Sequence, residues 1–197
     1  MQNPFTLTFG KSPLEPVERP LPTMEIVDTF TAETVNQQMF IITGVRGSGK
    51  TVMMTEIARR LREREDWVVI ELNPATDLLQ GMLAKLNSNK VCAAIIKSAK
   101  IDLSFFGFGV AIEGVPPLTD TETAIITILE KLKKQDKRLL ITIDEVTNND
   151  YMKVFAGSFQ IFVRQDLPVF LLATGLYENI DKLQNEKNLT FLFRAPK

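Results

Sequence analysis

The chain has 197 residues, of which 45% are hydrophobic and 24% are charged, and its 23 basic and 24 acidic residues leave a formal net charge of -1. This composition is typical of a globular protein of about one domain, and it excludes a disordered or collagen-like chain and a strongly basic nucleic-acid-binding protein. The chain has no histidine, which excludes Ser-His and Cys-His catalysis and histidine-bound metals. The single cysteine, Cys92, excludes an intramolecular disulfide and a cysteine-based zinc site.

The first 38 residues differ from the rest of the chain. Five of the ten prolines fall within the first 22 residues. Because proline lacks a backbone donor and blocks helices, we expect residues 1–38 to form an extended segment that packs on the core, with a short helix over 24–30. Residues 1–10 show no signal-peptide pattern, and no apolar run is long enough to span a membrane, so we expect a cytoplasmic protein without a membrane partner.

From residue 39 onward, short apolar runs alternate with amphipathic stretches. We expect strands at 39–43, 67–72, 139–143 and 167–173, and helices at 51–64, 78–86, 91–99, 151–164 and 176–183, with a further helix capped at 119–120. Strands that alternate with helices predict parallel pairing in an α/β sandwich, which would occupy residues 39–197. Residues 101–114 interrupt the alternation and predict an inserted β-hairpin. Its aromatic residues Phe105, Phe106 and Phe108 either contact a partner or DNA, or pack on the domain itself.

Residues 44–51 fit the pattern G-x-x-x-x-G-K-[ST] without a mismatch. Glycines let successive backbone N–H groups point at phosphate oxygens, and the helix that follows adds the positive end of its dipole. Lys50 would place a charge on the β- and γ-phosphates, and the Thr51 hydroxyl would be an oxygen ligand for Mg²⁺. The residues predicted to bind the nucleotide are Gly44, Val45, Arg46, Gly47, Ser48, Gly49, Lys50, Thr51 and Val52.

The apolar strand 139–143 ends in two carboxylates, Asp144 and Glu145. In a parallel sheet both would emerge at the edge where the phosphate loop lies. Asp144 could then bind Mg²⁺, directly or through water, and Glu145 could orient and deprotonate the attacking water. The alternative is a solvated strand end without a role in chemistry. A glutamate beside the γ-phosphate favours a hydrolase over a small-molecule kinase.

The phosphate loop, the acidic strand end and the later Thr174-Gly175 strand end resemble the core of AAA+ and STAND-type P-loop ATPases. They resemble in particular bacterial AAA-family ATP-binding proteins that are similar to archaeal-type ATPases. This resemblance implies a three-layer sandwich with a mainly parallel five-stranded sheet in the order 5-1-4-3-2. It also implies that Thr174 is the sensor that contacts the γ-phosphate or the water. The alternative is that Thr174 caps the helix that follows. Arg194 would be an arginine finger for a neighbouring subunit, or else a solvent-facing arginine.

The same resemblance implies ATP and Mg²⁺ as ligands, and the chain has no N-K-x-D guanine-reading motif. The segment that covers the adenine would lie within residues 9–19, with Pro13, Val17 and Arg19 as candidates. The chain stops three residues after Arg194, so the C-terminal lid of these families is expected to be absent from a truncated core. DNA contact is expected only through such a missing C-terminal region. The other expected partners are further subunits or another protein.

We therefore expect an Mg-dependent ATPase that acts as a nucleotide switch, with Lys50, Glu145, Thr174 and Arg194 as catalytic residues and Thr51 and Asp144 as metal ligands. The first alternative is a scaffold that binds ATP without hydrolysing it. A second is the ATPase module of a DNA-associated loader or transposition helper, and a third is a kinase.

Overall fold

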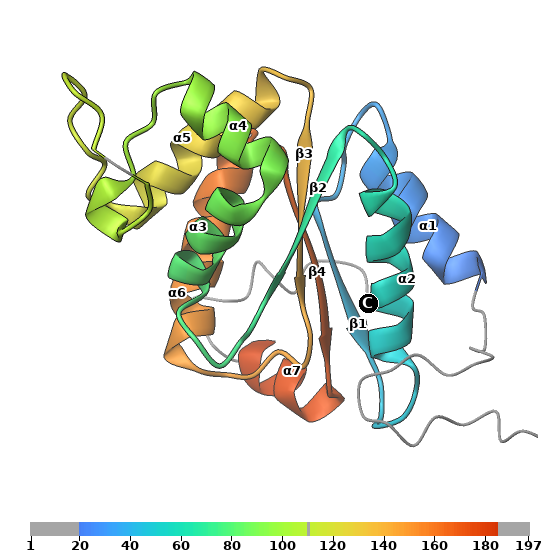
Figure 1. The fold of residues 1–197 in the computed structure, drawn as a ribbon. Helices are drawn as coiled ribbons and strands as arrows, with labels where there is room; N and C mark the ends of the chain where they lie inside the picture. The colour runs from blue at the N-terminus through green and yellow to red at the C-terminus, as the bar shows by residue number, and fades with distance from the viewer. Residues whose placement is uncertain (1–19, 110, 185–197) are drawn as a thin grey trace, which may run out of the picture.

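The computed structural model describes residues 20–109 and 111–184 of the chain. Four parallel strands form one sheet in the order β1-β4-β3-β2 (Figure 1). The strands are β1 (Met39–Thr43), β2 (Trp67–Leu72), β3 (Arg138–Ile143) and β4 (Val169–Gly175). In the register, Thr43 lies opposite Gly175 and Leu72 lies opposite Ile143. The carboxyl ends of all four strands therefore meet at one edge, which is the lower edge in Figure 1.

Helices cover both faces of this sheet (Figure 1). One face carries α1 (Pro20–Thr31) and α2 (Lys50–Arg62), and the other carries α3 (Leu78–Ser88), α4 (Lys90–Ser98), α5 (Thr121–Lys133) and α6 (Asp150–Arg164). A short 3₁₀ turn, η1, spans Ser104–Phe106, and α7 (Tyr177–Gln184) lies beside the carboxyl ends of the strands. Within the two described ranges, no helix has both the length and the apolarity that a membrane crossing requires.

The sheet separates two apolar clusters, because successive side chains of a strand point to opposite faces. In β3, Leu139 and Ile141 belong to the cluster under α3–α6, whereas Leu140 belongs to the cluster under α1 and α2. Cys92 is buried in the first cluster, as its apolar neighbours suggest, and this burial raises the pKa of its thiol to about 12. All four predicted strands are present, and the α/β fold with a parallel sheet is confirmed. The described residues contribute four strands, so the expected fifth strand and the order 5-1-4-3-2 stay a prediction.

Helix α1 is longer than the predicted helix at 24–30, because it begins at Pro20. Proline is tolerated in the first turn of a helix, where the backbone N–H groups have no partner within the helix. The carboxyl end of α1 is fastened to the sheet by Arg138, which donates to the carbonyl oxygens of Phe30 (2.6 Å) and Ala32 (3.2 Å). The Arg138 guanidinium also lies 5.9 Å from the ring centres of Trp67 and Phe170. Residues 1–19 lie outside the described part of the chain.

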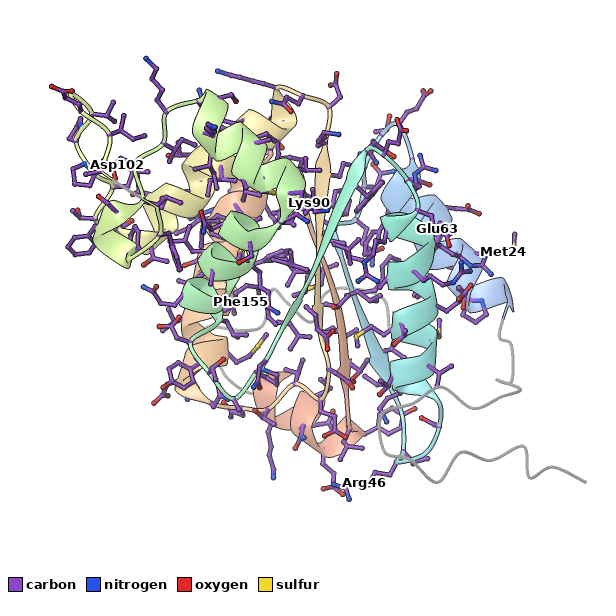
Figure 2. The ribbon with its side chains drawn as sticks, viewed as in Figure 1. Met24, Arg46, Glu63, Lys90, Asp102 and Phe155 are labelled. Atoms are coloured by element: carbon purple, nitrogen blue, oxygen red, sulfur yellow. The ribbon has the colours of Figure 1, made fainter. Side chains whose placement is uncertain are left out.

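The predicted β-hairpin at 101–114 is wrong. The described residues of this segment form the turn η1 and no strand. The buried Asp102 carboxylate accepts hydrogen bonds from the backbone N–H groups of Ser104 (2.9 Å) and Ile112 (2.8 Å), so the loop closes around a carboxylate instead of forming a ladder. Bonds from the Ser104 side chain and from these backbone groups lower the pKa of Asp102. Figure 2 shows this loop standing out from the sheet.

The three aromatic residues of the same loop differ in their surroundings. The sequence left open whether they contact a partner or DNA or pack on the domain itself. Phe106 and Phe108 pack against the larger apolar cluster, as expected for residues that stabilise the domain itself. Phe105 remains exposed and contacts the Phe106 ring edge-on.

Candidate nucleotide-binding site

The phosphate loop joins the end of β1 to the start of α2. Gly47 (φ 74°) and Gly49 (φ 82°) adopt left-handed backbone conformations, which favour glycine over residues with a side chain. At Gly44, a Cβ atom would lie 2.7 Å from the Ser48 Oγ, so the Ser48 side chain would have to move to admit one. Gly47 and Gly49 allow the tight turn that aims backbone N–H groups into the loop.

Lys50 points back into this loop. Its Nζ donates to the carbonyl oxygens of Gly44 (3.1 Å) and Val45 (2.9 Å). The ammonium group is thus held where phosphate oxygens would replace the two carbonyl oxygens as its partners. Val45 and Arg46 are exposed at the tip of the loop, and Figure 2 shows Arg46 at the lower end of the molecule.

Thr51, Asp144 and Thr174 meet beside the loop although they come from α2, the end of β3 and the end of β4. The Thr51 Oγ1 lies 3.2 Å and 3.0 Å from the two carboxylate oxygens of Asp144. Thr174 is completely buried, and its hydroxyl donates to Asp144 and accepts a hydrogen bond from the Glu145 N–H (2.9 Å). The Thr174 hydroxyl therefore bonds the Asp144 carboxylate and the backbone of Glu145. This geometry gives no support to the alternative prediction that Thr174 caps α7.

Glu145 stands at the turn that follows β3. Its backbone has a φ of 53°, which is uncommon for a residue other than glycine, and its side chain is exposed. The N–H of Val146 donates to the carbonyl oxygen of Thr174 (2.8 Å). Two consecutive backbone groups are thus tied to Thr174, so the turn directs the Glu145 carboxylate towards solvent at the same edge as the phosphate loop.

The oxygens of Thr51 and Asp144 fit Mg²⁺. Both are hard oxygen donors, which this cation prefers, and an octahedral site with bonds of about 2.1 Å places adjacent ligands about 3 Å apart. The two side chains have this separation. No cluster of three or more Asp, Glu, His or Cys side chains suited to a metal occurs in the described ranges. A site with few protein ligands is typical of Mg²⁺ that is bound together with a nucleotide.

The structure brings together most of the predicted site residues, namely the loop, Asp144, Glu145 and Thr174. Arg194 and the adenine candidates Pro13, Val17 and Arg19 lie outside the described residues. The sequence reasoning missed Asn149, whose side chain caps α6 and also bonds to the segment after β2. The cap could have been found, because an asparagine directly before an amphipathic stretch is a helix-start signal.

Comparison with known proteins agrees with this geometry. Residues 27–195 match the model of a family described as an ATPase domain predominantly from Archaea. The chain belongs to this archaeal-type ATPase family. The match covers both the phosphate loop and the acidic strand end, and a nucleotide-binding ATPase domain is the general assignment that it supports. No curated protein matches the sequence.

Solved structures are similar to this archaeal-type ATPase domain, and the ORC2 structure shares its fold. The ORC2 protein of Aeropyrum pernix, solved as ADPNP-ADP complexes, superimposes with a TM-score of 0.55 at 14% identity, over 96% of this chain and 49% of that protein. PCH-2 of C. elegans has a TM-score of 0.45 at 16% identity, over 89% of this chain and 40% of that protein. The chain thus spans half or less of the length of either. The expected resemblance to archaeal-type ATPases is confirmed by the family match, and the ORC2 structure shows the shared fold.

Proposed function

We propose that this domain binds Mg-ATP and hydrolyses it to ADP and phosphate. The proposal rests mainly on the hydrogen-bonded series Thr51–Asp144–Thr174–Glu145 at the carboxyl edge of the sheet, beside the phosphate loop. Through one buried hydroxyl, this series joins the Asp144 carboxylate, a candidate cation ligand, to the backbone N–H of Glu145, whose side chain is exposed. A phosphate loop alone would support binding, whereas a carboxylate on the backbone held beside it supports hydrolysis.

Each residue of the series has a distinct role. Lys50 and the loop N–H groups bind the β- and γ-phosphates, while Thr51 and Asp144 hold Mg²⁺, which neutralises charge that develops on the phosphate oxygens. Glu145 accepts a proton from the attacking water, and Thr174 acts as a sensor that holds Asp144 and Glu145 in a fixed relation. Proton acceptance requires a base within hydrogen-bond reach of the water, and the exposed position of Glu145 leaves that space free.

Adenine nucleotides are supported by the complexes named for the Aeropyrum pernix ORC2 protein. We further propose that hydrolysis serves as a switch that changes contacts with another subunit or a protein partner, and that Arg194 completes a neighbouring site in such an assembly. DNA contact would require a region beyond this domain, and a cytoplasmic location fits the ligand.

A nucleotide titration with detection of released phosphate tests the function. The unmodified chain is compared with Lys50→Ala, Glu145→Gln and, as a control remote from the site, Lys97→Ala on α4. We expect Lys50→Ala to weaken binding of a fluorescent ATP analogue at least about tenfold, because it removes the cation from the phosphates. We expect Glu145→Gln to bind normally and to lower phosphate release roughly 100-fold or more.

Two results would contradict the proposal. Tight binding without phosphate release by the unmodified chain would indicate a scaffold, and phosphate that appears on an acceptor would indicate a kinase. The control Lys97→Ala must bind the analogue and release phosphate as the unmodified chain does. Otherwise the effects of Lys50→Ala and Glu145→Gln cannot be assigned to the site.

A further inference from the structure

The segment 145–149, which connects β3 to α6, is fastened at both ends. At its start, the backbone N–H groups of Glu145 and Val146 donate to the hydroxyl and carbonyl oxygens of Thr174. At its end, the Asn149 side chain makes three hydrogen bonds. Glu145, the proposed base, therefore lies on a five-residue segment whose two ends are held by different parts of the sheet edge.

Asn149 uses the two ends of its amide for different partners. Its Oδ1 accepts a hydrogen bond from the Met152 N–H (2.8 Å) and so caps α6. Its Nδ2 donates to the carbonyl oxygen of Pro74 (2.7 Å) and to the Thr147 hydroxyl (3.1 Å). The carbonyl group of Pro74 lies 75 positions earlier in the chain, in the segment that follows β2. One partly buried side chain thus joins the connections that follow two neighbouring strands.

The anchor for Asn149 is itself a fixed turn. The side-chain oxygen of Asn73 accepts a hydrogen bond from the Ala75 N–H (2.9 Å). The backbone carbonyl oxygen of Asn73 accepts one from the Thr76 N–H (3.3 Å). These bonds hold the peptide between Pro74 and Ala75 in one orientation, so the Pro74 carbonyl is a fixed acceptor. A bond to such an acceptor restrains the segment 145–149 more than a bond to a mobile loop would.

We propose that Asn149 is a positioning residue for hydrolysis, which restrains the segment carrying Glu145 through its bond to Pro74. This inference rests on the proposed function. The Glu145 side chain is exposed, so the location of its carboxylate follows from the backbone that carries it. Displacement of a reacting group by about 1 Å can slow a reaction about 100-fold, and a segment released at one end permits displacements of that size.

The substitution Asn149→Asp separates this role from helix capping. Aspartate is as good a cap as asparagine, so α6 keeps its start, but the Nδ2 donor is lost and a carboxylate faces the Pro74 carbonyl. Asn89→Asp is the matched control. Asn89 caps α4 in the same way, accepting from the N–H groups of Val91 and Cys92, and α4 lies away from the site.

Steady-state phosphate release and binding of a fluorescent ATP analogue are measured with Mg²⁺ for both variants and for the unmodified chain. We expect Asn149→Asp to lower kcat about 10- to 100-fold, to leave the Kd for the analogue within about twofold, and to keep the far-UV circular dichroism. Asn89→Asp should match the unmodified chain in all three measurements. An unchanged kcat for Asn149→Asp overturns the inference, and so does a loss of affinity equal to the loss of rate.

A double variant shows whether Asn149 acts through Glu145. In single-turnover experiments, Asn149→Asp should cause little further loss in a Glu145→Gln background, because the carboxylate that it positions is already absent. A further loss of the same size as in the single variant overturns the inference while the proposed function stands. If the unmodified chain releases no phosphate, or if Glu145→Gln releases it at the unmodified rate, the proposed function fails and this inference fails with it.

Discussion

The Thr174 hydroxyl is the common partner of the Asp144 carboxylate and the Glu145 backbone N–H. Thr174→Val keeps the shape of the side chain but leaves the Asp144 carboxylate and the Glu145 N–H without their common partner. An unpaired buried polar group costs about 1–3 kcal/mol, so we expect a loss of unfolding free energy of that size in urea titrations. Phosphate release should fall at least about tenfold, since Glu145 loses one of its fastenings.

Thr174→Ser is the control for this prediction, because serine keeps the hydroxyl and loses one methyl group. It should retain most of the phosphate release while losing about 1 kcal/mol of stability. If valine and serine behave alike, the hydroxyl of Thr174 has no part in the site.

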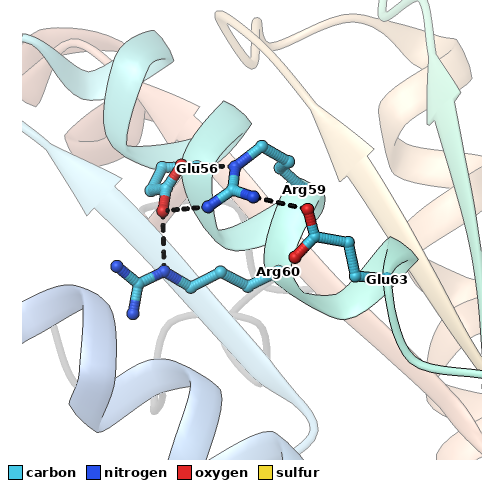
Figure 3. A network of polar contacts seen from close by, with 4 residues as sticks. All are labelled: Glu56, Arg59, Arg60 and Glu63. Atoms are coloured by element: carbon cyan, nitrogen blue, oxygen red, sulfur yellow. Dashed lines mark hydrogen bonds and ion pairs between the residues drawn. The ribbon is translucent and has the colours of Figure 1, made fainter.

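At the scale of single elements, α2 carries a network of charges on its exposed side (Figure 3). Glu56 accepts hydrogen bonds from Arg59 (2.9 Å) and Arg60 (2.7 Å), and these bonds lower the pKa of the Glu56 carboxyl to about 2 from its ordinary 4.5. Because the pKa is lowered in the folded state, the stabilisation is complete above pH 4.5 and is lost as the pH falls towards 2.

The Glu56 network is exposed to solvent, so its contribution to stability is small. We expect Glu56→Gln to lower the unfolding free energy at pH 7 by about 0.3–1 kcal/mol, and we expect this difference to shrink between pH 4.5 and pH 2. Urea titrations at several pH values measure it, and 1 M salt should reduce it at pH 7. A difference that grows as the pH falls would contradict the assigned sign.

The elements that were predicted well are those whose side chains repeat with a clear period. The strands of the sheet and the amphipathic helices follow from such patterns. The hairpin predicted at 101–114 is wrong because the pattern of residue types does not show that Asp102 is the buried centre of the loop. Most of the site was predictable because the phosphate loop and the Asp144–Glu145 pair are contiguous motifs. The bond of Asn149 to Pro74 was not, since it joins residues 75 positions apart and needs the topology of the sheet.

At the scale of the whole molecule, the sheet divides the buried residues into two clusters with no shared member. Ile57 on α2 belongs to one and Ile128 on α5 to the other, and both are completely buried. Each substitution to valine should cost about 0.5–1.5 kcal/mol of unfolding free energy. Because the two clusters are separate, the loss of unfolding free energy in the double variant should equal the sum of the two single losses within about 0.5 kcal/mol, as measured in urea. A larger discrepancy would show that the two faces of the sheet repack together.

The left-handed backbone at Glu145 has a consequence for how variants of this domain trade activity against stability. A side chain in that conformation costs about 1 kcal/mol relative to glycine, so the carboxylate is kept there against the local preference of the chain. The unfolding free energy of Glu145→Gly should therefore be about 1 kcal/mol higher than that of Glu145→Ala, as measured in urea, whereas the proposed function requires that neither variant hydrolyses ATP. Selection for stability alone would then favour glycine at this position. A domain that needs the carboxylate for hydrolysis keeps glutamate and has the lower unfolding free energy.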